Sequence, residues 1–157
     1  MIQVRNTIDL ILARTLVFLM ALMVINVLWQ VASRFILGSP SSFTDELARY
    51  LMIWIGILGA AYVSGKNMHV SIDVLVRRFG DHIQRRLKFL VAALIILFCI
   101  GVMVVGGGRL VYITHVLDQH SPALQVPLSV VYSIIPISGL LIVFYKVSDL
   151  INTKRWS

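Results

Sequence analysis

Long runs of apolar residues, almost free of charged side chains, dominate the pattern of this chain. They extend from Thr15 to Ser33, from Leu47 to Ser64, from Phe89 to Gly108 and from Leu128 to Tyr145. A helix needs about 20 mainly apolar residues to cross the hydrocarbon core of a bilayer. The pattern therefore predicts an all-α integral membrane protein, one four-helix domain over residues 1–157, with spans at about 15–36, 46–64, 87–110 and 127–146.

The composition agrees with this prediction and excludes several classes of soluble protein. Hydrophobic residues make up 59% of the 157 residues, charged residues make up 13%, and the mean hydropathy is +0.90. Soluble domains carry about 25% charged residues. Cys99 is the single cysteine, so no intrachain disulfide can form. The first apolar run is longer than the 7–15 residues of a signal peptide, and we expect it to remain in the protein.

The distribution of lysine and arginine predicts how the spans are oriented. Eleven of the 14 lie before the first span, between the second and third, or after the fourth, whereas three lie on the opposite side. Cytoplasmic loops carry the excess of these residues. We therefore expect both termini in the cytoplasm, and we assign the net charge of +7 to topology rather than to nucleic-acid binding.

The connection between the second and third spans is long enough to hold an element of its own. Ile72, Leu75, Val76 and Phe79 recur at helical spacing, and His69 and Asp73 lie mostly away from that apolar face. This pattern predicts an amphipathic helix at the membrane interface over about 69–80. The alternation from Met68 to Val76 would instead favour a strand, but an isolated strand would leave its edges unpaired.

The second span has signals at both of its ends. Thr44 is the expected N-cap, because Asp45 and Glu46 follow in the first turn, where the helix dipole favours anions. Gly65 is expected to end the helix.

Ionisable side chains are missing from the middle of every predicted span, and the polar groups there are few. Asn26 and Gln30 share one face of the first span, where hydrogen bonding between helices is a commoner use than coordination of a ligand. The third span can extend past Gly108, which would place Arg109 near the interface. Arg109 would then either snorkel to the headgroups or pair with an outer carboxylate or a partner chain.

These features make an autonomous transporter, a haem protein and an enzyme poor fits. Transport sites use ionisable residues or broken helices near the bilayer centre, and haem needs axial ligands inside the bundle. The four histidines lie in loops or near the interface, and no catalytic triad or metal-ligand pattern is present. We expect no catalytic residue, metal site or cofactor in this chain.

Small residues and a proline predict how the helices pack. Gly56, Ala60 and Ser64 recur every four residues along the second span, which would let another helix approach closely. Whether that helix belongs to this chain or to a partner stays open. Pro136 removes one backbone hydrogen bond and is expected to kink the fourth span.

One region is more specific than membrane insertion requires. The second span opens with the sequence DELARYLMIW from Asp45 to Trp54, and a Gly65–His69–Asp73 segment follows it. These residues, with Gln30–Phe35 and Pro127–Tyr132–Pro136, resemble the small membrane subunit of tripartite ATP-independent periplasmic (TRAP) transporters, the DctQ-like or SiaQ-like family. Asp45 departs mildly from the glutamate that is common there.

The resemblance implies a role beside larger partners in the bacterial inner membrane. In that family a large multi-span permease holds the sodium and substrate sites, and a soluble periplasmic protein delivers an organic acid, such as a C4-dicarboxylate or sialic acid. The small subunit is a static scaffold among membrane lipids. We expect Glu46 and Arg49 to form an ion pair that fixes the second span or helps to form a docking surface; simple capping and snorkelling are the alternative. The rival functions are an autonomous four-span small exporter and a haem-bearing or quinone-associated anchor.

Overall fold

The computed structural model of the chain describes residues 2–36, 38, 41–66 and 81–151. Its helices are α1 (Ile2–Phe35), α2 (Ser42–Gly65), α4 (Asp81–Phe98), η1 (Cys99–Gly106), α5 (Gly107–Val116), α6 (Leu128–Tyr132) and α7 (Ile134–Ile151). Among the described residues, four helical stretches, 3–35, 42–65, 89–116 and 128–151, are long and apolar enough to cross a membrane. The all-helical fold with four such helices is therefore confirmed.

The start of α2 differs from the expectation. Ser41 is its N-cap, with extended backbone and a side chain that accepts a hydrogen bond from the Thr44 amide at 3.5 Å. The predicted cap at Thr44 is wrong because the helix already includes that residue, whose hydroxyl donates to the Ser41 carbonyl at 2.9 Å. The helix ends at Gly65, as expected.

The third span is one long helix whose central part is π-helical. α4 passes into η1, where the Gly107 amide bonds to the Val102 carbonyl five residues earlier, and α5 then continues to Val116. The span therefore extends past Gly108, as the apolar sequence allowed. π-Helical segments are rare and are commonly found at functional sites.

The fourth span is interrupted where the sequence predicted a kink. α6 ends at Tyr132 and α7 begins at Ile134, so Ser133 separates two helices. Pro136 lacks an amide proton and cannot make the bond to the Tyr132 carbonyl that an unbroken α-helix would have. The next amide, on Ile137, lies 3.4 Å from the Ser133 carbonyl, longer than the 3.0 Å bond from Ser133 to Ser129.

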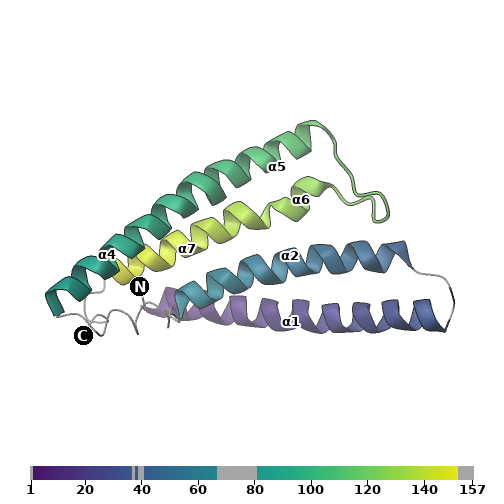
Figure 1. Cartoon of the computed structure of the whole chain (residues 1–157), viewed down its shortest axis with the longest axis horizontal. Coiled ribbons are helices and arrows are strands. Elements are labelled where there is room, and N and C mark those ends of the chain that lie inside the picture. Colours follow the sequence, from purple (N-terminus) through teal and green to yellow (C-terminus); the bar gives the residue numbers. More distant parts are fainter. Residues whose placement is uncertain (1, 37, 39–40, 67–80, 152–157) are drawn as a thin grey trace.

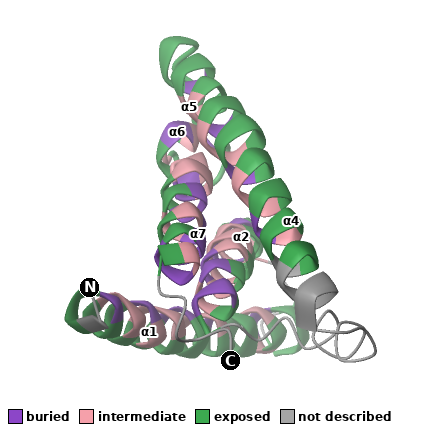
Figure 2. Cartoon of the chain, turned by 90° about the vertical axis from the view of Figure 1, so that its left-hand side faces the viewer, coloured by how far each residue is buried: buried purple, intermediate pink, exposed green. Residues whose placement is uncertain are grey.

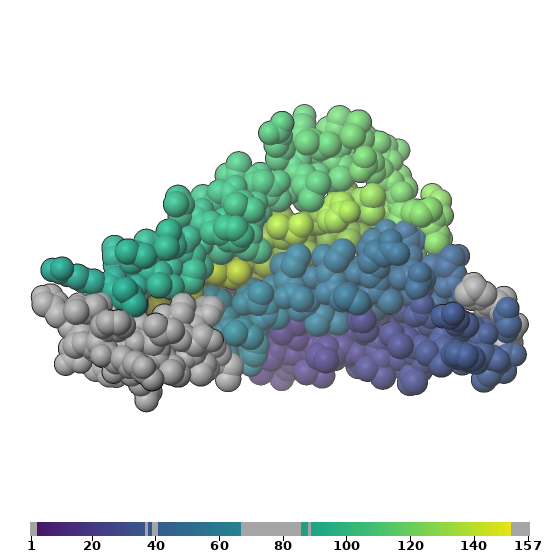
Figure 3. All heavy atoms as spheres, in the orientation of Figure 1, coloured from purple at the N-terminus to yellow at the C-terminus, as the bar shows by residue number. Residues whose placement is uncertain are grey.

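The helices are stacked side by side, and α2 and α7 are the central pair (Figure 1). α1 packs on α2, α2 on α7, and α7 on η1 and α4, so that α1 and the third span lie on the two outer sides. In the view along the bundle, the exposed residues lie mostly on the outer helix faces (Figure 2). Figure 3 shows α7, in yellow, between the atoms of α2 and those of the third span.

Two ends of the bundle can be distinguished. We call the terminal end the one where α1 begins, α2 ends, α4 begins and α7 ends (Figure 1). The loop end is the opposite one, with the connections after Phe35 and over residues 117–127. The predicted interfacial helix at 69–80 lies outside the described residues.

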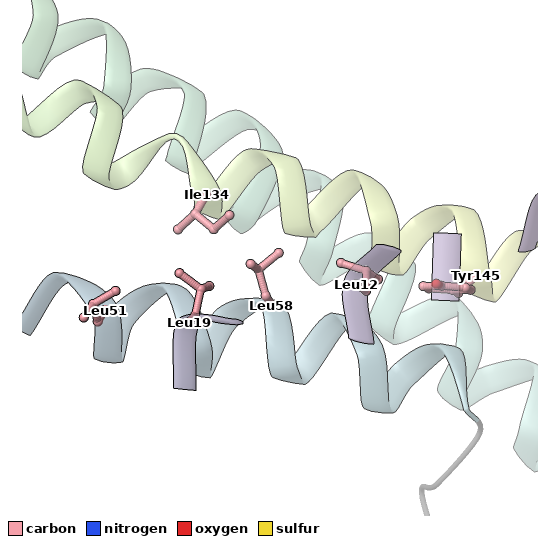
Figure 4. Close-up of a cluster of buried hydrophobic side chains, with 6 residues drawn as sticks. All are labelled: Leu12, Leu19, Leu51, Leu58, Ile134 and Tyr145. Atoms are coloured by element: carbon pink, nitrogen blue, oxygen red, sulfur yellow. The ribbon is translucent and has the colours of Figure 1, made fainter. Parts of the chain in front are cut away.

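The core is apolar and lies between α1, α2 and α7. Its buried side chains are those of Leu12, Leu19, Leu51, Leu58, Ile134 and Tyr145 (Figure 4). A second cluster of Ala61, Cys99 and Ile142 joins α2, η1 and α7. Lipid tails are as apolar as these side chains, so close packing and interhelical hydrogen bonds must hold the helices together.

Candidate functional site: polar contacts at the two ends of the bundle

At the loop end, the carboxylate of Glu46 binds the backbone of the 117–127 connection. One carboxylate oxygen accepts hydrogen bonds from the amides of Ala123 and Leu124, each at 2.9 Å, and the other accepts from the Tyr50 hydroxyl at 2.9 Å. Glu46 is 8% exposed. A buried carboxylate with three donors is well satisfied, so Glu46 anchors this connection to the first turns of α2.

The expected ion pair between Glu46 and Arg49 is not formed in the described part of the chain. Glu46 points to the 117–127 connection, whereas Arg49 is exposed on α2. The expectation was wrong because backbone amides distant in the sequence supply the partners of the carboxylate. Arg109 is also exposed, and within the described residues it pairs with none of Asp45, Glu46 and Asp118.

Asn26 and Gln30 make the interhelical hydrogen bonds that the sequence favoured. The side-chain amide of Asn26 donates to the Thr44 carbonyl at 2.8 Å, and that of Gln30 donates to the Asp45 carboxylate at 2.5 Å. Asn26 is buried, whereas Gln30 lies nearer the surface. These two bonds fix the end of α1 to the beginning of α2.

The Gly56–Ala60–Ser64 stripe on α2 is divided between the surface and the interior. Gly56 and Ala60 are exposed, and a Cβ atom placed on Gly56 would meet no atom within 4 Å. Ser64 is buried. The chain's own packing therefore uses only the Ser64 end of the stripe.

Glycines in other helices do allow close contacts within the chain. A Cβ on Gly139 in α7 would lie 2.7 Å from the Cβ of Met103 in η1. A Cβ on Gly107 would lie 2.8 Å from Cγ2 of Ile135 and 3.1 Å from Cδ of Pro136. The third and fourth spans therefore touch where both are irregular.

At the terminal end, a polar cluster that sequence reasoning missed joins α1, α2 and α7. Arg5 forms an ion pair with Asp149 at 2.5 Å and also donates to the Gly65 carbonyl. The Tyr145 hydroxyl donates to Asp9 at 2.6 Å, and the same carboxylate pairs with Lys66 at 3.3 Å. We call Arg5, Asp9, Gly65, Lys66, Tyr145 and Asp149 the terminal cluster.

Burial makes these contacts important for the arrangement of the helices. The side chains of Arg5 and Asp149 are 7% and 8% exposed, and Tyr145 is completely buried. The guanidinium of Arg5 also lies over the Tyr145 ring, 5.2 Å from its centre. Lys146, the neighbour of Tyr145, is buried as well. The signal in the sequence is the presence of charged residues at this end of α1, α2 and α7, but their number alone predicts only the orientation of the spans.

Two predicted site residues, His69 and Asp73, lie outside the described residues. Within the described ranges, no three side chains of His, Cys, Asp or Glu are grouped closely enough to hold a metal ion. The buried side chains of Asn26, Glu46 and Arg5 connect helices to one another or to the 117–127 connection.

Comparison with known proteins assigns the chain to a family. Residues 23–155 match the profile of the DctQ component of tripartite ATP-independent periplasmic transporters. The chain belongs to the DctQ family. It is a small permease subunit of a TRAP transporter, a multi-pass membrane protein and not an enzyme.

Individual DctQ-family relatives agree with this assignment. The chain is 31% identical over 135 residues to a protein of Haemophilus influenzae assigned as a TRAP transporter small permease protein, covering 86% of this chain and 82% of the relative. It is 31% identical to the C4-dicarboxylate TRAP transporter small permease protein DctQ of Rhodobacter capsulatus, over 65% of this chain and 44% of that protein. It is 29% identical to the sialic acid TRAP transporter small permease protein SiaQ of Vibrio cholerae, over 57% of this chain and 51% of that protein.

Proposed function

We propose that this DctQ-family chain is the scaffold subunit of a sodium-coupled importer of organic acids. The observation that carries the proposal is the placement of its polar groups. Asn26, Glu46 and Arg5 are all buried, and their partners are other parts of the same chain. Such groups hold helices in place, whereas the substrate and sodium sites belong to a larger partner.

The proposed partners are a large multi-span permease and a periplasmic substrate-binding protein. A TRAP transporter component implies both of them. The exposed part of the small-residue stripe, Gly56 and Ala60, and the exposed apolar face of α1 are available for the permease or for lipid. Sodium coupling would reside in the permease.

The substrate class is proposed from the names of two relatives. One is a C4-dicarboxylate transporter protein and the other a sialic acid transporter protein. Both substrates are carboxylates. A carboxylate is therefore the proposed cargo, with its identity determined by the partner chains.

The proposed location is the bacterial inner membrane, with the terminal end in the cytoplasm and the loop end in the periplasm. The excess of lysine and arginine near the terminal end supports this orientation. The loop end would then carry the surface on which the binding protein docks. The segment at 69–80, with His69 and Asp73, would lie along the cytoplasmic surface as an amphipathic helix.

Cysteine labelling tests the orientation. In a Cys99→Ala background, Asp118→Cys should react with a membrane-impermeant maleimide in cells whose outer membrane is permeabilised and whose inner membrane is intact. Arg14→Cys should react only after the inner membrane is opened. The reverse pattern would contradict the proposed orientation.

Purification from the native membrane in mild detergent, followed by mass spectrometry, tests the scaffold function. We expect a stoichiometric large permease to accompany the chain. We also expect uptake of a carboxylate by proteoliposomes to require both subunits, sodium and the binding protein. Transport by the purified chain alone would instead support the autonomous small exporter.

A further inference from the structure

The third and fourth spans are both irregular, and their irregular segments lie at the same level along the bundle. The π-helix η1 ends at Gly106, and the fourth span is interrupted at Ser133. The contact of Gly107 with Ile135 and Pro136 shows that the two irregular segments touch. π-Bulges and prolines are the usual sites where helices bend.

The residues beyond this crossing form a unit that packs mainly within itself and on η1, with fewer contacts to α7. We call it the loop-end lobe: α5, the 117–127 connection and α6, residues 107–132. α5 packs mainly on α6 and η1. The connection is closed on itself by backbone bonds such as Ser121 to Val126 at 3.0 Å and Leu128 to Gln119 at 2.9 Å.

The lobe is held to α2 at two places. Glu46 accepts from Ala123 and Leu124, and the indole of Trp54 donates to the Val131 carbonyl at 3.1 Å. Below the crossing, Gly139 lies against Met103 and Cys99, which clamps η1 to α7. The lobe is therefore joined to the bundle by two irregular backbone segments, by these hydrogen bonds, and by the packing of α5 and α6 on α7 next to the crossing.

We infer that the loop-end lobe is a hinged unit that pivots about η1 and Ser133, and that the Glu46 carboxylate is the latch that sets its position. When the latch is closed, the lobe lies on the first turns of α2, as in the structure (Figure 1). When the latch is open, the lobe moves while α1, α2, α4 and α7 keep their arrangement. The inference concerns this chain by itself and does not depend on the substrate, the partners or the orientation.

Distances between spin labels test the hinge in the full chain in lipid nanodiscs. In a Cys99→Ala background, labels at Tyr112→Cys on α5 and Leu28→Cys on α1 report on the lobe. Labels at Leu94→Cys on α4 and Phe18→Cys on α1 report on the remaining bundle. All four native side chains are exposed, so the labels disturb little packing.

Opening the latch with Glu46→Ala should broaden the distance distribution of the lobe pair and leave that of the bundle pair unchanged. Asp45→Ala is the matched control, since this neighbouring carboxylate contacts Gln30 and not the lobe. An unchanged lobe pair, or equal broadening of both pairs, would overturn the inference. If Glu46→Ala does not fold, Glu46→Gln, which keeps the volume of the side chain and removes the charge of the latch, is judged by the same two outcomes.

Stiffening the pivot provides an independent test. A Cβ on Gly101 or Gly108 would meet nothing within 4 Å, and one on Gly106 would meet only a carbonyl oxygen at 3.8 Å. Alanine restricts the backbone more than glycine does. The triple substitution G101A/G106A/G108A should therefore restore a narrow lobe distribution in the Glu46→Ala chain, and failure to narrow it would contradict a pivot at η1.

Discussion

The ring of Tyr145 occupies the space where a Cβ atom of Gly65 would be. A Cβ built on Gly65 would lie 2.7 Å from Cζ of Tyr145. Backbone flexibility is not the reason for glycine here, because the end of α2 has no positive φ angle at this residue. The close approach lets the Gly65 carbonyl accept a hydrogen bond from Arg5 while the tyrosine hydroxyl reaches Asp9.

Gly65→Ala should therefore destabilise the chain, whereas Gly59→Ala in the same helix should not. Overpacking of this kind costs about 1–3 kcal/mol, and a Cβ on Gly59 would meet no atom within 4 Å. Thermal unfolding in detergent measures the difference. Equal melting temperatures for the two variants would show that the Tyr145 ring moves aside at no cost.

The crossing of η1 and α7 gives a second glycine prediction. Gly139→Ala would place its methyl group 2.7 Å from the Cβ of Met103, so we expect a loss of about 1–3 kcal/mol. Gly108→Ala is the control, because its position is open. The measurement is the melting temperature of each variant, and a larger loss for Gly108→Ala would be incompatible with the described crossing.

Removing the Glu46 side chain should expose the 117–127 connection to proteases. Glu46→Ala leaves two backbone amides without their acceptor, which costs about 1–3 kcal/mol. Glu46→Gln keeps one acceptor oxygen and should lose less. Limited proteolysis measures cleavage in this connection; Asp45→Ala, which removes an exposed carboxylate, should be cleaved as slowly as the parent chain.

The Arg5–Asp149 pair should show strong coupling in a double-mutant cycle. Removing one partner of a buried ion pair costs about 3–5 kcal/mol because the other charge remains buried. Arg5→Leu should cost more than Asp149→Asn, since Arg5 also binds Gly65 and lies over Tyr145. The double variant should lose less than the sum of the single variants. If the two single variants lost stability additively, or if the exposed Arg14→Leu lost as much stability as Arg5→Leu, the pair would make no specific contribution to stability.

Tyr145→Phe separates the hydroxyl of Tyr145 from its ring. The variant keeps the ring that packs against Gly65 and loses the 2.6 Å bond to Asp9. A hydrogen bond to a charged group contributes about 1.5–3 kcal/mol. The exposed Tyr112→Phe should be neutral in the same unfolding experiment. A neutral result for Tyr145→Phe would assign the role of this residue to packing alone.

The sequence was sufficient to predict features that depend on local composition. The apolar runs predicted the four long helices, and Pro136 predicted the irregular fourth span because a missing amide acts on its own turn. Asn26 and Gln30 were expected to bond to another helix because polar side chains inside a membrane need partners.

The features that the sequence did not predict depend on residues brought together by the fold. Two of the groups that donate hydrogen bonds to Glu46 are backbone amides 77 and 78 residues later in the chain. Backbone amides are present at nearly every residue, so the sequence gives no sign of which ones a carboxylate will bind. Arg49, three residues away, was the more obvious partner. Ser41 and Thr44 are both good capping residues, and only the backbone angles distinguish the true cap.

The Arg5–Asp149 pair also has a consequence for biosynthesis. The two residues are 144 positions apart, so Asp149 is synthesised long after Arg5 and after the first three spans. Until then, the arginine at the start of α1 lacks its carboxylate. The final arrangement of α1 and α2 at this end of the bundle therefore forms only after α7 has been inserted. A chain truncated before Tyr145 should be recognised by quality-control proteases as incomplete, even though three of its four spans are already in the bilayer.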